Sequence, residues 1–461
     1  MQRMQNALNR PFGGKEVLMA TLFLPFGYPG YPQAQLAEHI ARSEAWLRDI
    51  GVDLVAAPNV IVLKDCDKAI EVAKSDVWDA VIVLIASWIE APNALKVLSA
   101  AGLEQTPMVL WSHDNYYDPK EKATISFGCI ASAGVMRETF EEFGYKFRFV
   151  VGNPGDEVLG KKITSFLAAA STLRKLKDAR LGMLGYVSMG MYTGLADHIK
   201  VKKVFGTEIV HMDQYSLIAH LDEASPQDIA AEKQALKDQW DVAGSISEEL
   251  LDRNASVYLR LKQLVKEQQL DALTAKCQYE MSIDWGFTPC VALSLLGANM
   301  PVSCEGDIYL LLSQMILDGI AGETTTYGDV LAFLSDGVIC AACGFAPKSF
   351  LAANRPKIDK HTALYSGLLI TTPFKRQDVT VIRLANDKGG FKMHLIEGHV
   401  EEMKDFHEID CPAYAGSVIK FDNKSVEDFQ QEIMSQHYAI VPGKHGDAVR
   451  QFCNLLNIRV V

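Results

Sequence analysis

The chain lacks the features that mark membrane-spanning and nucleic-acid-binding proteins. Its longest apolar run, residues 80–89, is far shorter than the ~20 residues that a transmembrane helix needs. Residues 1–15 are polar and mixed, without the apolar stretch of a secretory signal peptide. Acidic residues outnumber basic ones by 57 to 45, and the net charge of −12 disfavours a general binder of nucleic acid or anionic membrane. We therefore expect a cytoplasmic protein with no nucleic-acid or membrane partner.

Cysteine is present, but it shows no disulfide framework. The nine cysteines are odd in number and irregularly spaced, which favours reduced thiols in the cytoplasm. The one close pair, Cys340 and Cys343, could bind a metal ion or take part in redox chemistry. Because no second pair accompanies it, we interpret both as buried thiols. No G-x-G-x-x-G motif opens a helix in residues 15–150, so a dinucleotide cofactor is not expected.

Residues 15–150 alternate short apolar runs with amphipathic stretches. Strands are predicted at 17–24, 52–56, 80–86 and 108–111, and helices at 35–48, 68–73 and 92–101. Strands that alternate with helices form parallel βαβ units, so a doubly wound sheet is predicted here. Ligands bind at the carboxyl ends of such strands, where residues 26–28, 87–88 and 111–114 mix aromatic and small polar groups. These groups suit a sugar, although packing against a neighbouring segment explains them equally well.

A second alternating region follows a Lys- and Arg-rich stretch at 170–180. Strands are predicted at 181–187, 208–211, 272–277 and 302–304, and helical segments at 226–269 and 307–317. After about residue 348, Thr-, Val- and Ile-rich runs separated by turns predict antiparallel, barrel-like β structure. At 461 residues the chain is too long for one core. The predicted fold is therefore α/β, with two doubly wound parallel-sheet domains at 1–173 and 174–352 and a C-terminal β-rich domain at 353–461.

Three side chains could together bind one hard divalent cation. Glu305 ends a predicted strand, Asp329 adjoins an apolar run, and His437 precedes another. Two carboxylates and an imidazole leave coordination positions open, as a catalytic metal requires. Simpler explanations stay open for two of them, because Asp329 could be a turn residue and His437 a core residue. Asp307 is assigned to a helix N-cap instead, where its carboxylate would accept a backbone N–H.

Several motifs along the chain resemble those of the L-fucose isomerases and the related L-arabinose isomerases. They follow the order and approximate spacing of that family's active site, and they occur at 186–190, 196–198, 210–213, 278, 305–307, 329–330 and 436–437. The resemblance implies that Glu305 and Asp329 are the catalytic acids and that they bind the metal together with His437. It also implies substrate-binding roles for five further residues, which are Trp88, Ser188, Met189, Gln278 and Gln436. In that family the residue matching Trp88 enters the pocket of a neighbouring subunit.

The resemblance further implies aldose–ketose isomerisation of a free sugar through an enediol(ate). Mn²⁺, or another divalent metal ion, suits a set of carboxylate and imidazole ligands. The implied assembly is a homo-oligomer, a trimer or a hexamer, with active sites shared between subunits. The chain is shorter than typical fucose isomerases, and Gln436 stands where that family has asparagine, so a substrate other than L-fucose is favoured.

The substrate and the reaction class stay open on the sequence alone. L-Fucose, D-arabinose, L-arabinose and a C6-modified hexose such as sulfoquinovose all fit an enediol site. Lys375 and Arg376 could meet an anionic C6 group, although surface basic residues are usually only solvated. The alternatives to an isomerase are a sugar-binding or sensor protein without catalysis and a metal-dependent sugar epimerase or lyase.

Overall fold

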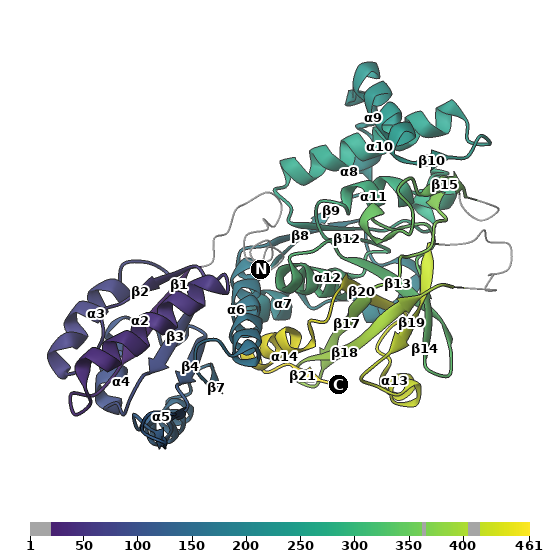
Figure 1. The fold of residues 1–461 in the computed structure, drawn as a ribbon. Coiled ribbons are helices and arrows are strands. Elements are labelled where there is room, and N and C mark those ends of the chain that lie inside the picture. Colours follow the sequence, from purple (N-terminus) through teal and green to yellow (C-terminus); the bar gives the residue numbers. More distant parts are fainter. Residues whose placement is uncertain (1–19, 362–365, 404–414) are drawn as a thin grey trace. The chain divides into compact units, whose positions relative to one another are not determined.

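The computed structural model of the chain describes residues 20–361, 366–403 and 415–461 (Figure 1). The chain forms two compact units. The first contains the described residues up to Arg174 and also Arg450–Leu455, and the second contains Lys175–Val449 and Leu456–Val461. The domain boundaries predicted after residues 173 and 352 stay predictions. Among the helices of the described residues, none has the length and apolar character needed to cross a membrane.

The first unit is built on a five-stranded parallel sheet in the order β2-β1-β3-β4-β7. Its elements are β1 (Thr21–Phe26), α2 (Gln33–Asp49), β2 (Leu54–Ala56), α3 (Cys66–Ala73), β3 (Ala80–Ile85), α4 (Ala91–Ala100), β4 (Met108–Ser112), α5 (Cys129–Glu142), β7 (Phe147–Val151) and α6 (Glu157–Lys177). A small hairpin of β5 (Tyr116–Asp118) and β6 (Ala123–Ile125) follows β4. The chain extends from β1 to β2 on one side and to β3, β4 and β7 on the other, so the predicted doubly wound sheet is confirmed.

The sequence explains why these segments become central strands. Every residue of β1 and of β3 is buried, as expected for parallel strands that are covered by helices on both faces. Helix α2 buries Leu36, Ile40, Ser43 and Leu47, which recur at helical spacing and form its inward stripe. The core of the unit gathers the apolar side chains of β1, β3 and β4 with those of α3, α4 and α5.

The second unit contains a four-stranded parallel sheet in the order β12-β11-β8-β9. The elements of this part are β8 (Arg180–Leu184), α7 (His198–Phe205), β9 (Glu208–Met212), α8 (Tyr215–Ile218), α9 (Pro226–Gln239), β10 (Asp241–Val242), α10 (Glu248–Glu267), β11 (Ala272–Ala275), α11 (Cys290–Leu296), β12 (Val302–Cys304) and α12 (Ile308–Ala321). All four strands of the sheet were predicted within a few residues. The second predicted parallel sheet is therefore also confirmed.

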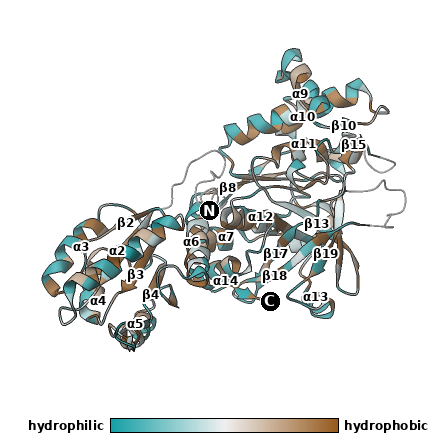
Figure 2. Cartoon of the chain, viewed as in Figure 1, coloured by the Kyte–Doolittle hydropathy of each residue, from teal (hydrophilic) through white to brown (hydrophobic). Residues whose placement is uncertain are grey.

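The single helical segment predicted at 226–269 is wrong. Two helices, α9 and α10, occupy this stretch, and both show alternating hydrophilic and hydrophobic segments in Figure 2. The helix breaks at Trp240, which is buried and extended (φ −126°, ψ 154°) because β10 pairs with a strand more than a hundred residues later in the chain. The side chain of Ser247 then caps α10 by accepting a hydrogen bond from the backbone N–H of Leu250. A distant pairing thus overrides a local helical pattern.

The C-terminal part of the second unit forms a closed antiparallel β-barrel. The barrel strands are β13 (Thr326–Phe333), β14 (Gly337–Ala341), β17 (Asp378–Asp387), β18 (Gly390–Glu401), β19 (Gly416–Phe421) and β20 (His437–Pro442). Their order is β17-β20-β13-β14-β19-β18, and the pairing of β17 with β18 closes the ring. The other elements are β15 (Lys357–Lys360), β16 (Leu368–Ile370), α13 (Val426–Glu432) and β21 (Arg459–Val460). Helix α14 (Gly446–Leu455) begins in the second unit and belongs to the first unit from Arg450 onward. The predicted C-terminal barrel is confirmed.

Helix α12 joins the four-stranded sheet to the barrel within the second unit. It contacts β11 and β12 of the sheet and β13, β17 and β20 of the barrel. All of its residues are buried, which matches a sequence that is apolar on nearly every face. Because Glu305 and Asp307 lie between β12 and α12, and His437 opens β20, this helix positions the candidate site.

Candidate active site

The loops at the carboxyl ends of β8, β11 and β12 form one edge of the four-stranded sheet. Each contains a non-glycine residue with positive φ, namely Met189 (49°), Tyr279 (63°) and Glu305 (67°). Such backbone conformations are unfavourable, and they cluster where a side chain must be held in a particular place. This edge is therefore the strained part of the sheet, and it is also where ligands bind in folds of this class.

The turn that carries Glu305 is locked to the loop after β8. The backbone N–H of Ser188 donates a hydrogen bond to the carbonyl oxygen of Glu305 at 2.8 Å. Gly306 follows with φ +70°, and a Cβ atom at this position would lie 2.3 Å from the carbonyl oxygen of Tyr186. Only glycine allows this approach, so the two loops fix the direction of the Glu305 side chain.

The barrel brings two more side chains to Glu305. Asp329 in β13 and His437 in β20 are directly paired across the antiparallel strands. Nε2 of His437 lies 3.2 Å from Oδ1 of Asp329 and 3.3 Å from Oε2 of Glu305. The His437 side chain is fully buried, whereas 23% of the Asp329 side chain is exposed. The three residues proposed as metal ligands are therefore brought together, although they lie far apart in the sequence.

Asp307 is hydrogen-bonded to the other ring nitrogen of His437. Its Oδ2 lies 2.9 Å from Nδ1 of His437, and its Oδ1 caps α12 by accepting the backbone N–H of Leu310 at 3.0 Å. Arg383 of β17 donates to both carboxylate oxygens, at 2.7 and 3.0 Å, and both side chains are fully buried. The N-cap prediction for Asp307 is confirmed.

The carboxylates beside Nε2 of His437 favour a positive charge at this position. Burial would raise the pKa of Asp307, but Arg383 and His437 hold it well below its usual range. The ionised carboxylate therefore accepts a hydrogen bond from Nδ1–H of His437. Burial alone would lower the pKa of His437, but the carboxylates of Asp329, Asp307 and Glu305 outweigh it and raise that pKa well above its usual value.

These residues fit a divalent metal ion in their chemistry. Among the described residues, Oε2 of Glu305 and Nε2 of His437 are buried and form no hydrogen bond. Ligands at about 2.0 to 2.2 Å from an ion lie roughly 3 Å from one another, close to the two distances around Nε2. A carboxylate bonded to the second ring nitrogen is the usual support of a ligand histidine. Within the described residues, however, no three His, Cys, Asp or Glu side chains already surround a common point as ligands do.

The predicted substrate-binding residues lie on different elements. Ser188 is buried and Met189 half-exposed in the loop after β8, and Gln278 is buried after β11. Gln436 precedes His437, and its carbonyl oxygen accepts the backbone N–H of Val330 at 2.9 Å. These four therefore accompany the strand ends that carry Glu305 and His437. Trp88 belongs to the first unit, where it follows β3 and is 37% exposed.

Two features of this edge were not predicted from the sequence. The first is the buried arginine Arg383. In the sequence it resembles any other residue of a barrel strand, and only its apolar neighbours in β17 indicate that its charge is buried. Lys276, directly after β11, is also fully buried, with its ammonium 3.5 Å from the centre of the Tyr186 ring and in an ion pair with Glu280. The burial of Lys276 could have been predicted from its place between an apolar strand and Cys277. Cys340 and Cys343 are both free thiols. Cys340 is buried as predicted, whereas Cys343 is only half-buried.

Comparison with known proteins adds a distant relationship. Two curated relatives, each named sulfoquinovose isomerase and found in Priestia aryabhattai and in Priestia megaterium (strain ATCC 12872 / QMB1551), are 20% identical over 449 residues. These matches cover 95% of this chain and 97% of each relative. A sulfoquinovose isomerase of Clostridium sp. (strain MSTE9) is 24% identical over 203 residues, which cover 44% of this chain and 45% of the relative. No family model matches the chain.

Proposed function

We propose that this protein is a metal-dependent aldose–ketose isomerase that acts on a C6-modified hexose such as sulfoquinovose. The distant homology to sulfoquinovose isomerases extends over nearly the whole chain and supports a sugar isomerase. The observation that carries the proposal is the convergence of Glu305 and Asp329 on Nε2 of His437. Neither a sugar sensor nor a structural site requires two acids beside one buried imidazole.

Glu305, Asp329 and His437 would hold the metal ion. Mn²⁺ is our choice, because it accepts carboxylate and imidazole ligands and keeps positions for exchangeable groups. A bound divalent ion would supply Lewis acidity to the sugar's carbonyl and to the adjacent hydroxyl. Asp307 would keep the His437 ring in one orientation through Nδ1, and Arg383 would keep Asp307 ionised.

The two acids would move protons between the carbon and oxygen atoms of the sugar. One carboxylate would take the proton from C2 and return it to C1, and the other would transfer the hydroxyl proton between O1 and O2. Oε2 of Glu305 forms no hydrogen bond with any of the described residues, so this oxygen is available to take up a proton. We therefore assign the carbon-bound proton to Glu305.

The assembly and location are also proposals. We propose a homo-oligomer, a trimer or a hexamer, in which the partly exposed Trp88 ring contributes to the site of another copy. Analytical ultracentrifugation checks this assembly, and a monomer at working concentration would contradict it. The eight described cysteines are free, which supports a reducing compartment such as the cytoplasm.

The isomerase proposal is tested by proton NMR in D₂O. The purified protein is incubated with sulfoquinovose, D-glucose, L-fucose and L-arabinose, first with Mn²⁺ and then with excess EDTA. We expect deuterium at C1 of the ketose formed from sulfoquinovose, at a rate that EDTA reduces by at least about 10²-fold. Exchange that persists in EDTA would contradict the proposed metal dependence. No exchange with any of these sugars would contradict the proposed isomerase activity.

A further inference from the structure

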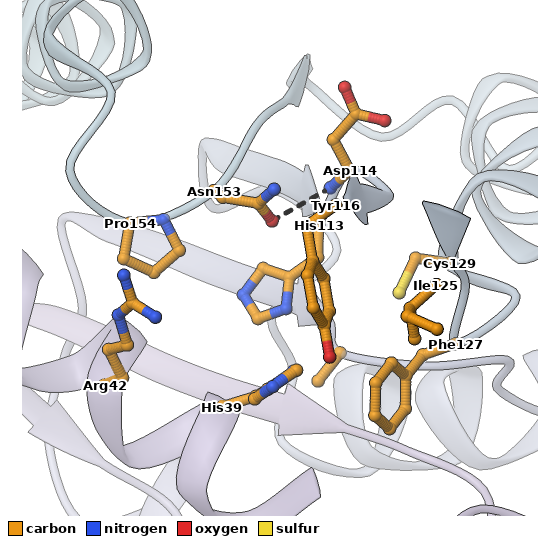
Figure 3. Close-up of a pocket in the computed structure, with 11 residues that line it drawn as sticks. His39, Arg42, His113, Asp114, Tyr116, Ile125, Phe127, Cys129, Asn153 and Pro154 are labelled. Carbon is orange, nitrogen blue, oxygen red and sulfur yellow. Dashed lines mark hydrogen bonds between the residues drawn. The ribbon is translucent and has the colours of Figure 1, made fainter. Parts of the chain in front are cut away.

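The first unit contains a cavity of its own, separate in sequence from Glu305 and His437. Its volume is about 440 Å³, and it lies at the carboxyl ends of β3, β4 and β7, the edge at which doubly wound sheets bind ligands. Figure 3 shows the side chains that matter most around it, which are His39, Arg42, His113, Tyr116, Phe127 and Asn153. They come from α2, from the segment between β4 and α5, and from the loop after β7.

One wall of the cavity carries the guanidinium of Arg42. Arg42 lies on the exposed side of α2, and it forms no ion pair with any of the described residues. Asp114 also lines the cavity, but its Oδ1 accepts the backbone N–H of Asn115 at 2.7 Å. In Figure 3 its carboxylate points away from the guanidinium. An anionic group of a ligand would therefore find an available arginine here.

The back of the cavity offers a hydrogen-bond acceptor. The hydroxyl of Ser43 donates its one proton to the carbonyl oxygen of His39 at 2.8 Å, so its oxygen must accept Nε2–H of His113 at 2.7 Å. Burial lowers the pKa of His113 to about 4, so the ring is neutral at pH 7. Nδ1 of His113 then has a lone pair and no donor among the described residues. A ligand hydroxyl could donate to it.

The remaining walls are aromatic. The His39 ring lies 4.8 Å from the centre of Phe127 and 5.9 Å from that of Tyr116. Such surfaces pack against the C–H faces of a sugar chain, while the few polar groups fix its orientation. The cavity thus combines a cation, an acceptor for hydroxyls and an apolar wall.

We propose that this cavity binds a small polyhydroxylated anion, of the class of a sugar acid. Arg42 holds the anionic group, His113 accepts a hydrogen bond from a hydroxyl, and His39, Tyr116 and Phe127 cover the carbon chain. This binding needs neither the metal ion nor the two acids of the proposed isomerase.

The test is isothermal titration calorimetry of the full-length protein with D-gluconate and with sorbitol, its uncharged counterpart. EDTA is present, so that metal chelation by gluconate contributes nothing. We expect gluconate to bind at least about tenfold more tightly than sorbitol, because only gluconate can form a charged hydrogen bond to Arg42.

The matched variants are Arg42→Gln and Arg48→Gln. Arg48 lies on the same helix, is paired with Glu44 and does not line the cavity. Arg42→Gln should weaken gluconate binding about tenfold and leave sorbitol binding unchanged, while Arg48→Gln should change neither. Equal binding of gluconate and sorbitol, or an unchanged affinity for gluconate in Arg42→Gln, would overturn the proposal.

Discussion

Two carboxylates separated by one residue have different surroundings in this protein. Glu305 faces Nε2 of His437 and has a buried oxygen that forms no hydrogen bond with the described residues. Asp307 is bonded on every side, to a helix N-terminus, to Arg383 and to Nδ1 of His437. A carboxylate with a free oxygen can bind a metal ion or take up a proton. A carboxylate whose hydrogen bonds are all made can instead stabilise the structure around it. Their substitutions should therefore have opposite effects on activity and stability.

Glu305→Gln should abolish turnover without unfolding the protein. Glutamine has nearly the same shape and can adopt the same backbone, but it cannot take up a proton. We expect the NMR exchange rate to fall by about 10²- to 10⁴-fold, with an unchanged melting temperature. Glu427→Gln, at an exposed position of α13, is the matched control and should retain full activity. Retained exchange in Glu305→Gln would remove this residue from the mechanism.

Asp307→Asn should instead lower the free energy of unfolding. Asparagine can still cap α12, but it leaves the buried guanidinium of Arg383 without a counter-charge, at a cost of about 3–5 kcal/mol. Asp387→Asn is the control, because Asp387 pairs with Arg459 on the surface and the expected loss is about 0–1 kcal/mol. Urea unfolding measures both. Equal losses in the two variants would show that the buried pair contributes little.

At the residue scale, the sequence indicated the candidate ligands but not their support. Glu305 could be placed because it ends a short apolar strand directly before glycine. The supporting role of Arg383 could not be predicted, because its partner Asp307 is 76 positions away and their contact depends on the packing of α12 against β17. Distances between ligands likewise depend on strand register, which no local pattern determines.

At the scale of elements, the turn between β12 and α12 decides where Glu305 points. The helix that follows is buried along its whole length and contacts both the sheet and the barrel. Strand and helix were both predictable, because each has a continuous apolar pattern. The break between α9 and α10 was not predictable, because it depends on the pairing of β10 with the distant strand β15 and not on the residues at the break.

Gly306→Ala should damage this turn more than backbone strain alone can explain. Gly102 has the same φ of +70°, but no atom lies within 4 Å of the place that an alanine methyl would occupy there. Gly102→Ala therefore reports the strain by itself, about 1–2 kcal/mol. At Gly306 the new methyl would also collide with the Tyr186 carbonyl, which adds about 1–3 kcal/mol. Thermal unfolding compares the two variants, and a loss at Gly306 no larger than at Gly102 would contradict the locked turn.

At the scale of the whole molecule, each unit contains a buried histidine that resists protonation. Burial lowers the pKa of His113 in the first unit and of His394 in the barrel to about 4. Unfolding returns each imidazole to a pKa near 6.5, so the unfolded chain binds more protons between these two values. The stability that these two buried imidazoles contribute is therefore complete above about pH 6.5 and is lost as the pH is lowered toward 4.

His394→Phe should reduce this acid sensitivity. The phenyl ring keeps the stacking with Phe429 and removes the titrating group, although it loses the 2.8 Å hydrogen bond to Tyr438. The wild-type protein should lose on the order of 3 kcal/mol more than the variant between pH 7.5 and pH 4. Urea midpoints at the two pH values measure the difference. Identical losses would show that His394 does not titrate in this range.

The position of β20 in the barrel has a consequence for how the protein is made. This strand pairs with β13 on one side and with β17 on the other, and it carries His437 as its first residue. During synthesis, a nascent chain that ends before β20 has two open strand edges, which invite association with other chains. The last barrel strand to leave the ribosome therefore closes the barrel and delivers the imidazole in one step, so the site cannot exist before the scaffold that protects it.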